Sequence, residues 1–461
     1  MCPLDLAHHD RRFFVFSTQR PLSQLKRLIA VIVLATMMLC GLSACGTEDD
    51  KGSVYFLNFK PEADETFQAI AREYEKETGV PVKVATAASG EYELTLKIEM
   101  MKRHSPTLFN VNGPVGLHKW LPYTADISDA EFVRNLKDDN LALKGDDGKT
   151  YGVPLAVEGY GIIYNQEIFD RYCALPGAKV ASAAQINNFA TLKAVAEDMQ
   201  ARKDQLGIQG AFASTSLASG EDWRWQTHLT NIPIYYELNE QGISDTKDIK
   251  FTYNQEFKQI FDLYLNNSTI DKKLAPSKNV TDSLSEFAQG KAAMIQNGNW
   301  AWSQISGVKG NIIKEDNIKF LPIYTGHAGE ETQGLAVGTE VSLAVNARAT
   351  KADQRATIEF VNWLLSSDVG KRYVSEDLGF NAPFTTFGPD DIPSDPLTAE
   401  VAKYVSNEQL RTIPWIFTIY PSQKFKDTVG QSMAQYASGS AQWQDVVDVF
   451  VDEWKAEKEE Q

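Results

Sequence analysis

Several large aromatic side chains lie outside the regular spacing of an amphipathic helix, among amide and acidic residues. Five of the nine tryptophans have this placement: Trp223, Trp225, Trp300, Trp302 and Trp415. Polar residues with no evident capping role accompany them: Asn58, Asn112, Glu158, Asp222 and Asn297. A pyranose ring has an apolar C–H face and a rim of hydroxyl groups, so a flat aromatic ring with carboxylate or amide groups around it can bind it. These residue types favour a carbohydrate-binding site.

The binding free energy of such a site is sufficient for micromolar affinity. Each stacked ring buries about 50–80 Å² of apolar surface and contributes roughly 1–2 kcal/mol. Micromolar affinity needs about −8 kcal/mol, so two or three stacked rings with charged hydrogen bonds suffice. Trp363, Trp443 and Trp454 lie on helical stripes, where core packing explains them.

Sequence patterns of known catalytic sites are absent. The chain has no H-E-x-x-H, no G-x-S-x-G, no P-loop and no G-x-G-x-x-G that opens a helix. Downstream of residue 44 the histidines are His104, His118, His228 and His327, with no close ligand-like pair, so we expect no metal and no cofactor. We expect a binding protein. Acidic residues are numerous, so the alternative of a glycoside hydrolase with two carboxyl groups about 5–10 Å apart stays open.

The N-terminal region has the pattern of an export signal. An apolar run at 28–42 follows Lys26 and Arg27, and its length suits a signal-peptide core better than a membrane-spanning helix. The LSAC stretch that ends at Cys45 resembles the bacterial lipoprotein box, in which the cysteine is diacylated and becomes the mature N-terminus. The alternatives are an ordinary secretory cleavage site and a short membrane anchor.

We therefore expect a signal peptide at 1–44 and a polar tether at 45–53. The protein would be lipid-anchored at the cell membrane, on its extracytoplasmic face, and would touch the membrane only through Cys45. The chain has 45 basic and 61 acidic residues and a net charge of −16, which argues against nucleic acid or an anionic lipid surface as a partner. After cleavage and lipidation, Cys173 would be the remaining cysteine, so no intramolecular disulfide is expected.

Hydrophobic periodicity predicts an α/β fold. Apolar runs at 54–59, 80–86 and 108–112 are typical of buried strands. Between them, two helices are predicted, the first from Phe67, Ile70, Ala71 and Tyr74 and the second from Leu94, Ile98 and Met101. This alternation predicts a parallel sheet with helices on both faces, whose ligands bind beyond the carboxyl ends of the strands. The Asp-Gly pair in 145–154 predicts a hairpin.

Further helices are predicted in the second half of the chain. The first contains Phe257, Ile260, Phe261, Tyr264 and Leu265, the second contains Ile358, Val361 and Leu365, and the last contains Val446, Val447, Phe450, Val451 and Trp454. No Pro-rich linker or internal repeat divides the chain.

Three stretches resemble the family 1 extracellular solute-binding proteins, the carbohydrate receptors of ABC importers. They are YGVPLAVEGYGIIYNQEIF (151–169), AAMIQNGNWAWSQI (292–305) with its Asn-Gly-x-Trp-Ala-Trp pattern, and FLNFKPEADETFQAIAREYEKETGVPVKV from residue 56. The resemblance covers 54–455. It implies a two-lobe, periplasmic-binding-protein-like α/β fold of type II with three crossings near 155–158, 320–324 and 364–367. Lobe 1 would comprise 54–156 and 323–365, and lobe 2 would comprise 157–322 and 366–461.

The resemblance also implies a sugar bound between the lobes, hinge closure on binding, a monomer, and delivery to the transmembrane subunits of an ABC permease. The candidate ligand-binding residues are Trp300, Glu158, Asn58, Glu62, Asn112, Trp223, Asn297, Trp302, Glu340 and Trp415. The chain departs from the maltose receptor after its first and third strands. We therefore expect another di- or oligosaccharide, such as a raffinose-type α-galactoside. A peptide or a polyol is the alternative ligand.

Overall fold

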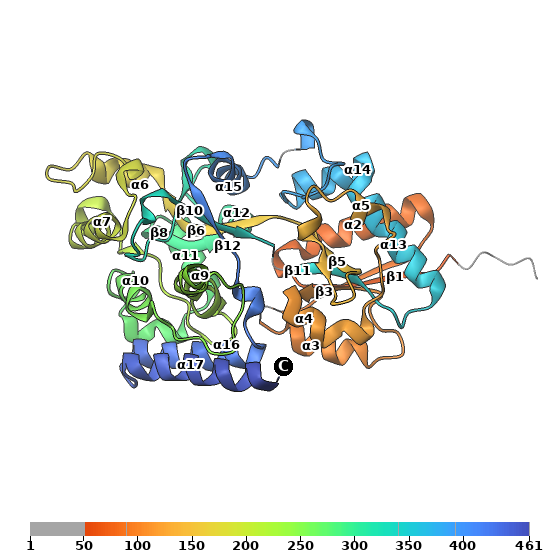
Figure 1. Ribbon diagram of the computed structural model, residues 1–461. Coiled ribbons are helices and arrows are strands. Elements are labelled where there is room, and N and C mark those ends of the chain that lie inside the picture. Colours follow the sequence, from red (N-terminus) through yellow and green to blue (C-terminus); the bar gives the residue numbers. More distant parts are fainter. Residues whose placement is uncertain (1–50, 89, 340, 392, 461) are drawn as a thin grey trace, which may run out of the picture. The chain divides into compact units, whose positions relative to one another are not determined.

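The computed structural model describes residues 51–460, apart from residues 89, 340 and 392. The expected signal peptide and the predicted sites Cys45 and Glu340 therefore lie outside the described residues. From Gly52 onward the chain forms one compact unit. Its described strands form two sheets, each with its own helices (Figure 1), and we call each sheet with its helices a lobe.

The sheet of the first lobe has the strand order β2-β1-β3-β11-β5-β4. Its strands are β1 (Val54–Asn58), β2 (Val82–Thr86), β3 (Leu108–Asn112), β4 (Leu143–Lys144), β5 (Thr150–Pro154) and β11 (Val341–Val345). As predicted, β1 pairs in parallel with β2 and β3. β11 pairs antiparallel with β3 and β5, so the sheet is mixed and not wholly parallel. The predicted hairpin is confirmed, because β4 and β5 are antiparallel neighbours.

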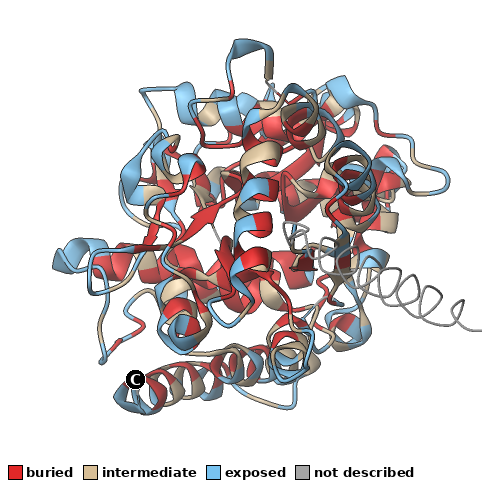
Figure 2. Ribbon diagram, turned by 90° about the vertical axis from the view of Figure 1, so that its right-hand side faces the viewer, coloured by how far each residue is buried: buried red, intermediate tan, exposed pale blue. Residues whose placement is uncertain are grey.

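Helices cover both faces of this sheet. They are α2 (Asp64–Thr78), α3 (Tyr92–Met100), α4 (Gly113–Trp120), α5 (Glu131–Arg134), α13 (Lys351–Ser366) and α14 (Asp368–Arg372). Successive side chains of a strand point to opposite faces. Phe56 of β1 thus packs in one core with Phe67 of α2, and the next residue, Leu57, packs in a second core with Leu96 of α3. Figure 2 shows that buried residues follow the strands and lie toward one side of many helices.

The helix predicted from Leu94, Ile98 and Met101 is α3, but these residues are not its buried face. They are 56%, 46% and 74% exposed, whereas Tyr92 and Leu96 are buried. The Tyr92 hydroxyl bonds to the backbone of β1 and β3 and so turns its own side of the helix toward the sheet. A hydrogen bond to the sheet thus decides which of two apolar faces is buried.

The sheet of the second lobe has the strand order β12-β10-β6-β8-β7, with β9 paired to β6. Its strands are β6 (Glu158–Asn165), β7 (Gly210–Phe212), β8 (Ala292–Gly298), β9 (Ile318–Leu321), β10 (Gln333–Gly338) and β12 (Arg411–Pro414). Its helices are α6 (Gln166–Cys173), α7 (Phe189–Ala201), α8 (Lys203–Leu206), α9 (Thr230–Gln241), α10 (Asn254–Asn266), α11 (Val280–Ala288), α12 (Ala301–Ser306), α15 (Pro396–Ser406), α16 (Gln423–Ser438) and α17 (Trp443–Glu460). A π-helical turn, Arg224–Leu229, precedes α9.

Two of the three crossings lie elsewhere than predicted, one by strand pairing and one by core packing. The first agrees, because β5 and β6 belong to different sheets. The crossing expected at 320–324 lies instead between β10 and β11, since β10 pairs with β6 and β12 of the second sheet. The one expected at 364–367 lies between Phe387, which packs in the first lobe, and Leu397, which packs in the second. The segment 323–338 therefore belongs with the second sheet, because strand pairing, which local sequence does not reveal, assigns it there.

Candidate functional site

A cavity of about 320 Å³ lies between the two lobes, beyond the carboxyl ends of β1 and β3. From the first lobe it is lined by residues 59–62 after β1, by Tyr92 and Glu93 of α3 and by Asn112 at the end of β3. From the second lobe it is lined by Glu158, by residues 220–224 and 226–228, by Trp300 and Gln304 after β8, and by Gln423 and Lys426 of α16. A ligand in this cavity contacts both lobes.

Three rings of the second lobe form an aromatic wall: Trp223, Trp300 and His228. The centroids of Trp223 and Trp300 are 5.9 Å apart, and the His228 ring lies 4.9 Å from the first and 5.6 Å from the second. Burial holds the pKa of His228 well below its usual range, so the imidazole is neutral at physiological pH. The Trp223 and Trp300 rings are of the kind that stack on the apolar face of a sugar, and the uncharged His228 ring packs at a steep angle against both.

The position of Trp300 is set by the backbone beneath it. Its six-membered ring lies directly on Gly298, the last residue of β8, and a Cβ atom at that position would overlap ring carbons. Trp415 packs behind the wall, with ring centroids 5.9 Å from His228 and 6.3 Å from Trp300. Glycine at 298 and a large ring behind the wall thus fix the indole that faces the cavity.

Lys60 and Glu158 form an ion pair across the cavity, one residue from each lobe. Lys60 Nζ donates to Glu158 Oε1 at 2.8 Å and to Oε2 at 3.0 Å, and the side chains are 13% and 5% exposed. Glu62 Oε1 lies 3.7 Å from the same nitrogen. Burial raises the pKa of Glu62, and the charge of Lys60 opposes that shift. The oxygens of these carboxyl groups can accept hydrogen bonds from hydroxyl groups.

Asp222 and Arg224 flank Trp223 and line the same cavity. The Arg224 guanidinium stacks on the Trp223 ring at 3.8 Å from its centroid, and burial lowers the pKa of Arg224 to about 9. The Asp222 carboxyl lies against Gly430 of α16, where a Cβ atom would overlap it. Burial raises the pKa of Asp222 to about 7, and the charges of Asp427 and Glu221 add to that shift.

Residues 69–402 match the model of the bacterial extracellular solute-binding protein family. The chain belongs to this family. The resemblance seen in the sequence is thereby confirmed, and the family is one of binding proteins.

Known proteins resemble this solute-binding protein in sequence or in fold. It is 24% identical over 310 residues to the melibiose/raffinose/stachyose-binding protein MelE of Bacillus subtilis, a match that covers 65% of this chain and 69% of MelE. The structure of a chitin oligosaccharide binding protein has a TM-score of 0.70 and 17% identity over 89% of this chain and 100% of that chain. RafE in complex with raffinose has a TM-score of 0.65 and 20% identity over 88% and 99%. These likenesses confirm the two-lobe α/β fold.

The structure brings five of the predicted site residues of this solute-binding protein to the cavity: Trp300, Glu158, Glu62, Asn112 and Trp223. Asn58 does not line it, because its amide nitrogen donates to the Lys60 carbonyl at 2.7 Å and shapes the loop after β1. The side-chain oxygen of Asn297 accepts a hydrogen bond from the Gly298 backbone at 2.9 Å. Trp302 packs on the core that contains Leu284 and Ile305, and Trp415 lies behind the aromatic wall.

Sequence reasoning missed several lining residues, of which Lys60, Arg224 and His228 matter most. Lys60 stands two positions before Glu62 in the first loop, and Arg224 directly follows Trp223, so proximity to predicted residues was the available signal. His228 has no neighbouring histidine or cysteine, and lone histidines are usually structural. Its part in the wall depends on the π-helical turn that carries it, which the sequence does not reveal.

Among the described residues there is no cluster of three or more His, Cys, Asp or Glu side chains suited to a metal ion. In the same part of the chain, no helix combines the length and the apolar character that a membrane crossing requires.

The raised pKa of Asp222 predicts that the stability of the folded protein depends on pH. Its pKa of about 7 in the fold exceeds the ordinary value of 3.8, so the folded state holds a proton that the unfolded chain releases. This contribution is fully present below pH 4 and is lost as the pH rises through about 7. We expect Asp222→Asn, which keeps the shape without the charge, to unfold at the same temperature as the parent at pH 4 and several degrees higher at pH 8. Calorimetry at both pH values measures this, and equal midpoints at pH 8 would contradict it.

Proposed function

We propose that this solute-binding protein captures an oligosaccharide in the cavity between its lobes and delivers it to the transmembrane subunits of an ABC importer. The observation that carries the proposal is that the rings of Trp223 and Trp300 line the same cavity as the carboxylates of Glu62 and Glu158, whose side chains are 14% and 5% exposed. Stacking surfaces with hydroxyl acceptors beside them match the apolar face and the hydroxyl rim of a sugar ring. Membership of a solute-binding family supports transport as the purpose of this binding.

We propose a raffinose-type α-galactoside as the ligand. The relative MelE carries melibiose, raffinose and stachyose in its name, and RafE was solved with raffinose. In this proposal Trp300 and Trp223 stack on sugar rings, and Glu158, Glu62 and Asn112 bond to hydroxyl groups.

A thermal-shift series tests the ligand class. The protein would be heated with raffinose, melibiose, stachyose, maltose and chitin oligosaccharides, and with peptides and polyols as controls. A ligand that binds only the folded state at a hundredfold excess over Kd stabilises it by about 2.7 kcal/mol. A shift with the galactosides supports the proposal in full. A shift with chitin oligosaccharides alone would overturn the galactoside assignment, and a shift with peptides alone would overturn the carbohydrate assignment.

Neighbouring tryptophans provide a matched pair of variants. We expect Trp300→Ala to raise the Kd for the sugar about tenfold, since it removes one stacking surface worth roughly 1–2 kcal/mol. Trp302→Ala deletes the same side chain outside the cavity and should leave the Kd unchanged, although it lowers the unfolding temperature. Titration calorimetry measures both. Equal losses of affinity in the two variants would show that the effect of Trp300 is general destabilisation.

We propose in addition that Cys45 carries a lipid anchor. The basis is the LSAC stretch after an apolar run, and the anchor would hold the receptor beside its permease. We expect the protein expressed from its own signal to fractionate with membranes and to be released into the soluble extracytoplasmic fraction by Cys45→Ser. Mass spectrometry of the N-terminal peptide checks the modification, and an unmodified N-terminus at another residue would refute it.

A further inference from the structure

A second, much smaller cavity adjoins the large one and shares Arg224 and Val280 with it. Its volume is about 10 Å³, and Arg224, Tyr264 and Gln296 are among the residues that line it. These three side chains are 3%, 1% and 2% exposed. Buried polar groups of this kind normally have hydrogen-bond partners.

Each of these three side chains carries a buried polar atom that no group in the described part of the chain satisfies. These atoms are Nε and Nη1 of Arg224, the hydroxyl of Tyr264 and Oε1 of Gln296. The orientation of the Gln296 amide is fixed, because its Nε2 donates to the Arg224 carbonyl at 2.7 Å. The cavity is thus bordered by a cationic donor, by a hydroxyl that can donate or accept, and by an amide acceptor.

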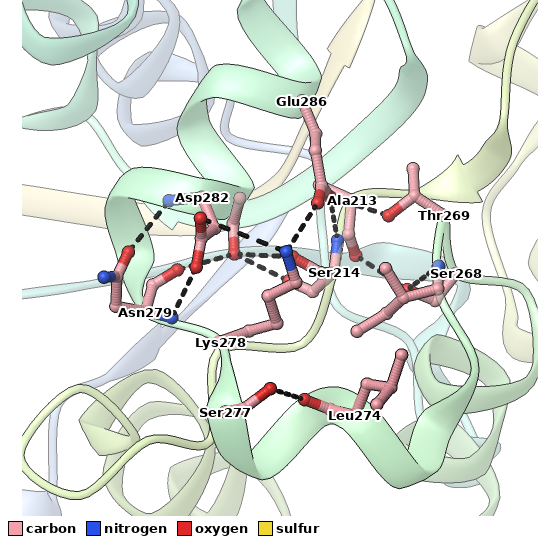
Figure 3. Close-up of polar contacts among 12 residues, drawn as sticks. Ala213, Ser214, Ser268, Thr269, Leu274, Ser277, Lys278, Asn279, Asp282 and Glu286 are labelled. Carbon is pink, nitrogen blue, oxygen red and sulfur yellow. Dashed lines mark hydrogen bonds and ion pairs between the residues drawn. The ribbon is translucent and has the colours of Figure 1, made fainter.

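Ser214 and Ser283, which also line this cavity, already have hydrogen-bond partners. Ser283 Oγ donates to the Ser214 carbonyl at 2.7 Å. Beside them, Glu286 accepts the Ser214 backbone N–H at 2.7 Å and the Thr269 hydroxyl at 2.6 Å (Figure 3). The unsatisfied groups are therefore concentrated on Arg224, Tyr264 and Gln296.

We infer that this cavity binds one water molecule, which accepts from Arg224 and Tyr264 and donates to Gln296 Oε1. A space of about 10–15 Å³ holds a single water, and such waters typically make about three hydrogen bonds. A halide would face the lone pairs of Gln296 Oε1, and a cation would face the guanidinium. Water can donate and accept, so it satisfies all three side chains.

This water positions the Arg224 side chain, which lines the ligand cavity. Arg224 borders both cavities, and its guanidinium lies 3.8 Å from the centroid of the Trp223 ring. A water bound from behind fixes the guanidinium in the plane that covers one face of Trp223. The water and its contact with Arg224 do not depend on the proposed sugar, whereas the affinity test below rests on raffinose as the ligand.

A crystal structure at a resolution that shows ordered waters tests the inference directly. We expect one density peak within about 2.7–3.2 Å of Arg224, of the Tyr264 hydroxyl and of Gln296 Oε1, in crystals with and without raffinose. Crystals soaked in bromide serve as the control for an anion. No peak, an anomalous bromide signal at this place, or a raffinose oxygen there would overturn the inference.

Two variants test the positioning role. Tyr264→Phe removes one oxygen and Gln296→Leu removes the acceptor, and we expect both to lose the water and to turn Arg224 away from Trp223 in crystal structures. With raffinose as the probe, the Kd is expected to rise about threefold to tenfold. Tyr164→Phe is the matched control, because its hydroxyl bonds to Gln166 at 3.1 Å, away from both cavities. An unmoved Arg224 in Tyr264→Phe, which is the milder change, would overturn the positioning role.

Discussion

Replacing Gly298 by alanine is expected to raise the Kd for the transported sugar about 100-fold. The added Cβ overlaps the six-membered ring of Trp300, so the indole must leave the place where it faces the cavity. The variant loses the stacking contact, and the displaced ring takes up space that the sugar needs. Together these effects cost about 3 kcal/mol of binding free energy.

Titration calorimetry with the sugar identified by thermal shift measures the effect. The control is Gly334→Ala, a change in a buried strand where the nearest atoms lie 3.5 Å from the added Cβ, an ordinary contact. That variant should bind like the parent. A Gly298→Ala protein that retains full affinity would show that Trp300 can move without loss, and so would remove it from the binding surface.

The second large effect is expected from Lys60→Met, which leaves Glu158 buried without its partner. Breaking one side of a buried ion pair costs about 3–5 kcal/mol. Because the pair joins the two lobes across the cavity, we expect most of this cost to weaken the closed, ligand-bound arrangement, with a Kd about 100-fold higher. Calorimetric titration and unfolding, run on the same sample, separate affinity from global stability.

The double variant Lys60→Met/Glu158→Gln distinguishes pairing from other effects. Removing the charge of Glu158 abolishes the cost of leaving it unpaired, so the two changes together should do less harm than their sum. Lys76→Met is the matched control, because its ion pair with Glu73 is 73% and 30% exposed and is worth at most about 1 kcal/mol. If the losses of binding free energy in the two single variants simply add up in the double variant, the ion pair does not have this role.

The elements of the fold were predictable where a single periodic signal dominates. The strands β1, β2 and β3 and the helices α2, α10 and α17 lie where continuous apolar runs or helical stripes predict them. The buried face of α3 was not predictable, because Leu94, Ile98 and Met101 form an equally apolar stripe and the hydroxyl of Tyr92 decides between them. The sheet to which β10 belongs was not predictable either, since partner strands are distant in sequence.

Some residues of the candidate site were likewise predictable from the sequence, and others were not. Trp300 was found through the Asn-Gly-x-Trp-Ala-Trp pattern, but the pattern alone does not tell Trp300 from Trp302, since only the turn after β8 places one in the cavity and the other in a core. Arg224 and His228 were missed because their part in the cavity follows from burial and from ring contacts between distant segments.

The close fit of two side chains on glycine backbone has a consequence for the thermodynamics of binding. Trp300 rests on Gly298, and Asp222 rests on Gly430, so each is confined by a surface that cannot rotate away. Ordering a free side chain at an interface costs about 0.5–1.5 kcal/mol of binding free energy. Because these two side chains are ordered when the protein folds, ligand binding does not include that cost. Trp300 and Asp222 are therefore already ordered when a ligand binds. Replacing the side chain that lies on the glycine can change the specificity while the backbone keeps its conformation.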